Sequence, residues 1–338
     1  MPQTKVEQGF YLLQTSINQL VQTLEINFYD AYIETLDNIG DHNQVRVIEG
    51  QPSPDVVKKV EASYKELEEL ELLPEEKRKI TQLVLLDGMR KEPIQQNHQL
   101  TPDAIGFLFV YLIEQLAPKK KNPLLSIHDL TVGMGNLLFT VLTNLTLAEY
   151  QLTSTGIDID DTLLSIAAST ADWLNLPVTL YHQDSLEPLL LDPSDIAIGD
   201  LPIGYYGLEE KSNQFRMQVE EGHSYAHHLL LEQSMKYVKE NGFGIFLLPS
   251  NFMTTEQADK LKEWIAEDVY LQGIIQLPSS LFKNEQSQKS IVIVQNKGKR
   301  SRQAKEILVT ALPSLKDPQH LQLFFNQFQD WCEDNIIN

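Results

Sequence analysis

The sequence is poor in cysteine and in positive charge. A single cysteine, Cys332, stands among 338 residues, which excludes an intrachain disulfide and favours a reducing, cytoplasmic compartment. Lys and Arg together number 27 against 47 Asp and Glu, a formal net charge of −20. A surplus of negative charge opposes unaided binding to a polyanion such as nucleic acid.

Long apolar runs are also missing. No stretch approaches the roughly 20 apolar residues that a membrane-spanning helix requires, so we expect no membrane partner. The N-terminal MPQTKVEQGF lacks the charged and apolar regions of a signal peptide. There is no internal repeat or low-complexity tract, and the length suits one large α/β domain with a smaller appendage.

Residues 1–95 contain no run that is typical of a strand. Apolar residues recur at helical spacing over residues 10–36, a Ser-Pro signal at Ser53 opens a second segment, and Pro74 opens a third. The pattern predicts an N-terminal all-α domain over residues 1–95. Such a domain serves packing or homodimerisation, or alternatively contacts the substrate directly.

From residue 96 to residue 338, short apolar runs alternate with helical segments. In several runs both the odd-numbered and the even-numbered positions are apolar, which is typical of strands that are buried on both faces. Alternating units predict a second domain of the α/β class with a mostly parallel, doubly wound sheet, and the last residues indicate one more strand and a helix. Seven runs predict the strands: 126–130, 152–159, 177–184, 195–202, 242–249, 269–278 and 290–297.

Parallel sheets bind ligands at the carboxyl ends of their strands. We call the loop that follows each predicted strand its exit, and the exit of the first strand reads HDLTVGMGNLL. Asp129 ends the strand, and Gly133 and Gly135 form a Gly-x-Gly turn that lets the backbone approach a ligand or simply makes a tight turn. A dinucleotide fingerprint has a third glycine, where this chain has Leu138, which weakens an NAD interpretation.

The second and third exits also carry carboxylates. Asp158, in GIDID, is placed to accept the ribose hydroxyls of an adenosine-containing cofactor, while Asp160 or Asp161 caps the following helix. Asp184, in HQDSL, is placed to accept from an adenine amino group. The alternative for Asp184 is an Asx-turn or helix cap before Pro188.

The fourth exit reads GDLPIGYY. The carboxylate of Asp200 and the carbonyl of Leu201 are acceptors for the N–H groups of an amine on a planar ring. Pro202 stiffens this loop, and Tyr205 and Tyr206 supply rings for stacking.

In this order, the motifs resemble class I S-adenosylmethionine-dependent methyltransferases of the adenine-N6 DNA methylase type. The resemblance is strongest to modification subunits of type I restriction systems and to YtxK-like proteins with an N-terminal helical domain. It covers about residues 95–310 and rests on HQLTPDAIGFLF, DLTVGMGNLL, GIDID, QDSL, GFGIFLLPSNF, IIQLPSSLF and the GDLPIGYY loop.

The resemblance implies a seven-stranded Rossmann-like sheet, S-adenosyl-L-methionine as cofactor, no metal, and transfer to adenine N6 in DNA. Leu201 and Ile203 depart from the family's loop, which has a proline and a stacking aromatic there. Protein glutamine, RNA, or a non-catalytic cofactor-binding role remain alternatives. The implied cofactor residues are Thr101, Pro102, Asp129, Thr131, Gly133, Gly135, Asp158, Ile159, Gln183 and Asp184, and the implied catalytic residues are Asp200, Leu201, Pro202 and Tyr205.

Three further features have two interpretations each. His223 and His227 have zinc-binding spacing, but a capped, partly exposed helix explains them better. Residues 207–222 form a substrate lid or a solvated insertion. Two basic segments either contact DNA phosphates or are solvated. A separate specificity subunit is the partner that would offset the acidic charge. The basic residues are Lys119, Lys120, Lys121, Lys283, Lys289, Lys297, Lys299, Arg300, Arg302 and Lys305.

Overall fold

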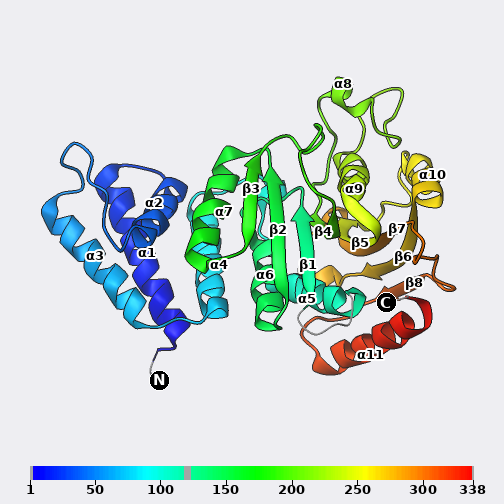
Figure 1. Cartoon of the computed structure of the whole chain (residues 1–338). Coiled ribbons are helices and arrows are strands. Elements are labelled where there is room, and N and C mark those ends of the chain that lie inside the picture. Colours follow the sequence, from blue (N-terminus) through cyan, green and yellow to red (C-terminus); the bar gives the residue numbers. More distant parts are fainter. Residues whose placement is uncertain (1–2, 118–122, 337–338) are drawn as a thin grey trace.

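The computed structural model describes residues 3–117 and 123–336. Lys119, Lys120 and Lys121 lie outside the described residues. A group of helices stands on one side of an α/β sheet, and the C-terminal helix lies beside the opposite part of that sheet (Figure 1). Within the described ranges, no helix has the length and apolar character needed to cross a membrane.

The N-terminal helices follow the predicted pattern with one exception. Helices α3 and α4 begin at Pro54 and Pro74, as predicted. The stretch 10–36 is interrupted, because Glu25 takes a left-handed φ of 53° and Asn27 caps a new helix by accepting from the Asp30 N–H. The four helices are α1 (Lys5–Leu24), α2 (Phe28–Gly40), α3 (Pro54–Glu69) and α4 (Pro74–Lys91).

The described chain forms an eight-stranded sheet of order β3-β2-β1-β4-β5-β7-β6-β8, in which β7 alone runs antiparallel to its neighbours. All seven predicted runs are strands, and the further strand predicted near the C-terminus is also present, so the sheet has eight strands and not the seven that the resemblance implies. A short eighth strand pairs in parallel with β6. The strands are β1 (Leu124–Asp129), β2 (Gln151–Asp158), β3 (Val178–His182), β4 (Ser194–Asp200), β5 (Val238–Pro249), β6 (Val269–Gln276), β7 (Lys289–Asn296) and β8 (Leu308–Ala311).

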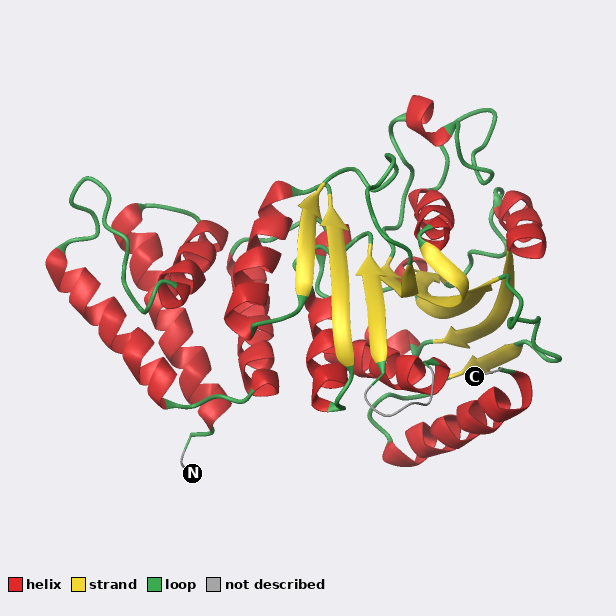
Figure 2. Ribbon diagram, in the orientation of Figure 1, coloured by secondary structure: helices red, strands yellow, loops and turns green. Residues whose placement is uncertain are grey.

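Helices cover both faces of the sheet (Figure 2). Alternate strand residues belong to different cores, since Ile198 packs with one set of helices and Ala197 with the other. The first set is α5 (Asp103–Leu116), α6 (Asn136–Leu147), α7 (Asp161–Leu174) and α11 (Pro318–Asn335), and the second is α9 (Ala226–Lys236) and α10 (Ala258–Asp268). Short helical turns complete the chain: η1 (Gln96–His98), α8 (Glu209–Ser212), η2 (Ser279–Leu281) and η3 (Glu285–Ser287).

The N-terminal helices share a core with the α/β part. Met134, Leu163 and Ile166 belong to the same buried cluster as residues of α1, α2 and α4. Nearby, the buried Tyr32 hydroxyl lies 2.8 Å from Oγ1 of Thr170. The division at residues 95 and 96 remains a prediction, and the contacts across it include buried apolar packing as well as polar pairs.

Candidate active site

The site lies where the sheet order reverses. Strands β1 and β4 are parallel neighbours, and the chain continues from them to opposite sides of the sheet. Their last residues, Asp129 and Asp200, therefore come together. They line one pocket with Asn97, His98, Gln99, Leu100, Thr101, Thr131, Val132, Gly133, Met134, Asn136 and Leu137.

The loop after β1 is a tight turn. The Gly135 N–H donates to the Val132 carbonyl at 2.8 Å, and both Gly133 (φ 53°) and Gly135 (φ 86°) take left-handed conformations. A Cβ at position 135 would lie 2.2 Å from the ring of Phe139, whereas one at position 133 meets nothing within 4 Å. Gly135 is thus required for packing, and Gly133 leaves open space at the pocket.

Asp158 supports this loop. Its two carboxylate oxygens accept from the backbone N–H groups of Gly133 (2.7 Å) and Asp160 (2.9 Å), and burial raises its pKa. Asp160 caps α7 by accepting from Leu163, as predicted. The neighbouring Ile159 is 63% exposed. The ribose contact of Asp158 and a cofactor contact of Ile159 stay predictions.

Asp129 is buried at the base of the pocket. One of its oxygens accepts from the backbone N–H of Thr131 at 2.9 Å and from the Thr131 hydroxyl. Burial raises the Asp129 pKa to about 7, against the opposing effect of the Thr131 hydrogen bonds and with a further increase from Asp158 and Asp200. The site therefore gathers three carboxylates at neighbouring strand ends.

Asp184 has partners within the chain. It accepts from the Leu186 N–H, which is the predicted Asx-turn, and also from the Tyr206 hydroxyl (2.7 Å) and the Lys211 ammonium (3.0 Å). Its adenine contact stays a prediction. Next to it, Gln183 donates to the Pro188 carbonyl at 3.2 Å.

The Thr-Pro segment and the residues before it contact the GDLPIGYY loop. The Thr101 hydroxyl donates to Oδ2 of Asp200 at 2.8 Å, and Pro102 precedes the first turn of α5. Asn97 donates to the Ile203 carbonyl at 3.0 Å and accepts from the Ile203 N–H. The loop is thus held from a segment about 100 residues earlier in the chain.

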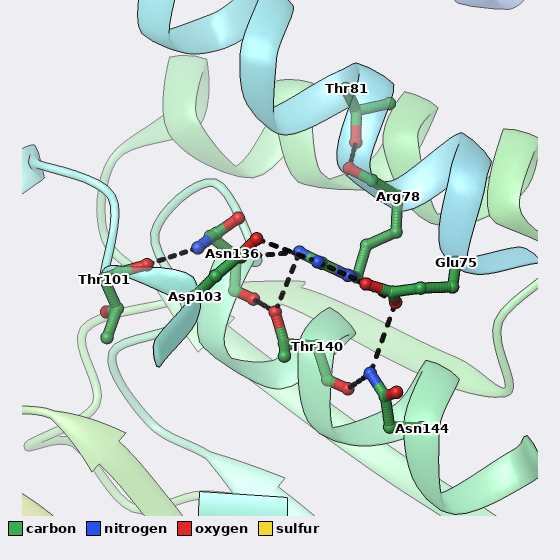
Figure 3. Close-up of polar contacts among 8 residues, drawn as sticks. All are labelled: Glu75, Arg78, Thr81, Thr101, Asp103, Asn136, Thr140 and Asn144. Atoms are coloured by element: carbon green, nitrogen blue, oxygen red, sulfur yellow. Dashed lines mark hydrogen bonds and ion pairs between the residues drawn. The ribbon is translucent and has the colours of Figure 1, made fainter. Parts of the chain in front are cut away.

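A buried arginine connects this segment to helix α4 (Figure 3). Arg78 is 2% exposed and donates to Glu75, to Asp103 at the start of α5 and to Oγ1 of Thr140 in α6. Asn136, the first residue of α6, donates to the Thr101 carbonyl. No local pattern in the sequence indicates this network, because its members lie far apart in the chain.

The second unforeseen residue is Lys289. Its ammonium donates to Oδ1 of Asp200 and to the Leu201 carbonyl, the latter at 3.0 Å. The expectation of a solvated lysine is wrong at this position, and a phosphate contact of Lys289 stays a prediction. Lys289 begins β7, which lies beside β5, and this pairing places its side chain at the end of the neighbouring β4.

Leu201 has a structural reason to replace proline. Its side chain is buried, and its N–H donates to the Leu247 carbonyl at 3.2 Å, a bond that proline cannot make. Pro202 follows directly. The substitution therefore exchanges the stiffness of proline for a hydrogen bond to β5.

The aromatic side chains stack on one another. The ring of Tyr205 lies 4.9 Å from that of Tyr225, which lies 5.0 Å from His227. A second pocket is adjacent to this stack and is lined by Ile203, Tyr225, His227, Pro249, Ser250, Asn251, Thr254, Thr255, Glu285 and Gln288.

The helix expected around the histidines is present as α9, but it is buried at His227 rather than partly exposed. His223 precedes α9, and His227 is only 2% exposed and lies beside the Pro202 backbone. Burial, His228 and the charge of Lys289 lower the His227 pKa to about 3. In the described ranges, no group of three potential metal ligands gathers.

The structure changes part of two predictions, one for the segment 207–222 and one for the basic residues. In the segment 207–222, Phe215 and Met217 are buried, so the segment is anchored rather than fully solvated. Of the remaining basic residues, Lys297 donates to the Ala266 and Glu267 carbonyls, and Arg302 donates to the C-terminal helix. Exposed side chains remain at Lys283, Lys299, Arg300 and Lys305.

A model of the N-6 DNA Methylase family matches residues 97–323, which is more than half of the chain. The chain belongs to the N-6 DNA methylase family. The matched residues include the Thr-Pro segment, the glycine loop, Asp200 and Lys289. The N-terminal helices precede the match.

Similarity to other proteins extends beyond the residues that the family model matches. The uncharacterized protein YtxK of Bacillus subtilis is 39% identical over 254 residues, covering 75% of this chain and 76% of YtxK. A Listeria monocytogenes structure, described as a candidate class I S-adenosylmethionine-dependent methyltransferase, is 38% identical with a TM-score of 0.88, covering 97% and 98% of the two chains.

A more distant structure shares the fold. A modification subunit of a candidate type I restriction enzyme from Vibrio vulnificus is 13% identical, with a TM-score of 0.66 and coverage of 100% and 92%. The methylase therefore has the fold of class I methyltransferases, with an N-terminal helical part included in the similarity.

Proposed function

We propose that this protein is an S-adenosylmethionine-dependent N-methyltransferase whose acceptor is adenine N6 in DNA. The observation that carries the proposal is the convergence of two acceptors on one nitrogen. Oδ1 of Asp200 and the Leu201 carbonyl both accept from the single Nζ of Lys289, so the loop has the geometry to hold a primary amino group.

The pocket beside this loop suits the cofactor. S-adenosylmethionine supplies a methyl group bonded to positively charged sulfur, which a neutral amine nitrogen can attack directly. The Asp158 carboxylate, which accepts only from backbone N–H groups, favours a cation at this end of the sheet. Gly133 leaves the loop open toward the ligand, and Thr101 and Asp129 line the same pocket.

The chain's own residues then hold the acceptor. Asp200 and the Leu201 carbonyl accept the two N–H groups, which raises the electron density on the nitrogen, and Asp200 can receive the proton that the nitrogen loses. Thr101 fixes the other Asp200 oxygen. The ring lies on the side of Ile203 and the Tyr225 stack. This chemistry requires no covalent enzyme intermediate.

A partner fits the charge of the chain. With a net charge of −20, the protein gains little from phosphate contacts alone. We infer a separate specificity subunit that supplies positive charge and sequence recognition. Homodimerisation through the N-terminal helices is the alternative assembly.

The test uses purified protein, S-adenosylmethionine and genomic DNA that lacks N6-methyladenine, with the modified base quantified by mass spectrometry. New N6-methyladenine is expected in the wild type and none with Asp200→Ala. Calorimetry on the same samples should show equal cofactor affinity for the two proteins, because Asp200 acts on the acceptor.

Two outcomes would change the proposal. Cofactor binding without a methylated base would favour a protein or RNA acceptor, or a non-catalytic role. Methylation that survives in Asp200→Ala would exclude GDLPIGYY as the acceptor loop.

A further inference from the structure

Lys289 lies where the proposed function places the acceptor nitrogen. Its Nζ donates to Oδ1 of Asp200 and to the Leu201 carbonyl, and the Lys289 and Asp200 side chains are only 16% and 24% exposed. A primary amine of the chain itself therefore fills the amine subsite.

The ammonium and an acceptor amine compete for the same atoms. Oδ2 of Asp200 already accepts from the Thr101 hydroxyl at 2.8 Å, so an arriving amino group finds both carboxylate oxygens in use. Hydrogen bonds from a charged donor are stronger than those from a neutral amine. As long as Lys289 stays, a neutral acceptor is at a disadvantage.

A second pocket lies close to the start of β7, where Lys289 is located. Lys289 begins β7 directly after the turn η3, and the neighbouring Glu285 and Gln288 line the pocket that also contains Tyr225 and His227. Lysine has a flexible four-carbon stem, and the exposed Glu285 carboxylate is an alternative partner. The neutral imidazole of His227 adds no competing positive charge there.

We propose that Lys289 is an internal competitor of the acceptor: its ammonium fills the amine subsite and withdraws toward Glu285 when an acceptor amine binds. The inference rests on the proposed function, since it takes the acceptor nitrogen to bind Asp200 and Leu201. Lys289 is a positioning residue in this scheme.

Binding of adenosine tests the proposal without requiring turnover. Titrations by calorimetry or NMR, with S-adenosylhomocysteine present, compare the wild type with Lys289→Met and Lys289→Ala. Both variants should bind adenosine about fivefold more tightly. A purely structural lysine would not produce this gain in adenosine affinity.

Lys289→Arg is the matched control. Its guanidinium keeps positive donors at the acceptor pair, so its adenosine affinity should not exceed that of the wild type. The Lys289 variants should still bind S-adenosylhomocysteine, which shows that they are folded. Adenosine affinity that fails to rise in both Lys289→Met and Lys289→Ala would overturn the competitor role.

Methyl transfer is measured separately, so the two ideas can fail independently. A gain in adenosine affinity with no transfer in any variant would contradict the proposed function and leave Lys289 as a competitor. Methyl transfer by the wild type with no gain in adenosine affinity in the variants would support the proposed function and exclude Lys289 as a competitor.

Discussion

Asp129, Asp158 and Asp200 end three strands, yet the environment of each carboxylate differs. Asp158 accepts two backbone N–H groups, Asp200 accepts from Thr101 and Lys289, and Asp129 accepts only from Thr131 among the described residues. Burial without a cationic partner is what raises the pKa of Asp129 to about 7.

This pKa makes stability depend on pH. The folded state keeps the Asp129 proton that the unfolded chain releases above about pH 4, so the wild type loses stability as pH rises from about 4 to 7. Asp129→Asn lacks this proton. Its free energy of unfolding relative to wild type should therefore rise by up to about 1.4 kcal/mol for each pH unit in that window.

Denaturant unfolding at pH 5, 6, 7 and 8 measures the effect. Asp259→Asn, at a side chain that is 92% exposed, controls for the loss of one negative charge. Parallel stability curves for Asp129→Asn and the wild type would refute the assigned pKa.

At the scale of elements, helix α4 is part of the support of the site. Through Arg78 it reaches the start of α5 and the first turns of α6, and both helices begin at the pocket (Figure 3). Asn136 then ties α6 to the Thr101 carbonyl. The N-terminal helices therefore influence a pocket that they do not line.

Removing this arginine should have two effects. Arg78→Met leaves Asp103 and Glu75 without their buried partner, which should cost about 3 kcal/mol of folding free energy. S-adenosylmethionine should also bind more weakly, because Asp103 and Thr140 no longer hold the Thr101 segment. Chemical denaturation and calorimetry measure the two quantities.

The matched control is Arg46→Met, at an exposed pair with Glu34 in which Arg46 is 61% exposed. It should cost less than about 1 kcal/mol and leave cofactor binding unchanged. If Arg78→Met retained full cofactor affinity, the network would be a packing feature alone.

At the scale of the whole molecule, the shared core links the two parts of the chain. Met134, Leu163 and Ile166 pack with the N-terminal helices, and removal of those helices would expose this apolar surface. A boundary that buries apolar side chains couples the unfolding of its two sides.

Scanning calorimetry of the full chain should therefore give one transition, with equal calorimetric and van't Hoff enthalpies. A fragment beginning at residue 96 should be less soluble than the full chain. Two separated transitions would instead support independent domains over residues 1–95 and 96–338.

The strand pattern and the order of the strand exits could be predicted because both are local. Apolar runs specify strands, parallel strands gather their ends, and Asp129, Asp158 and Asp200 follow those runs directly. The break between α1 and α2 was missed because capping at Asn27 overrides a continuous apolar period. The further strand near the C-terminus was predicted without bounds, and it is β8, a short and exposed strand with Val309 at 73%.

The sequence alone determined the class of fold, the carboxylates at the strand ends and the place of the GDLPIGYY loop after β4. Only the tertiary structure decided which distant charges meet them. Lys289 reaches Asp200 because β7 inserts antiparallel beside β5, and Arg78 reaches Asp103 because α4 packs on α6. Charge pairs of this kind depend on the spatial neighbours of a side chain, which no local pattern specifies.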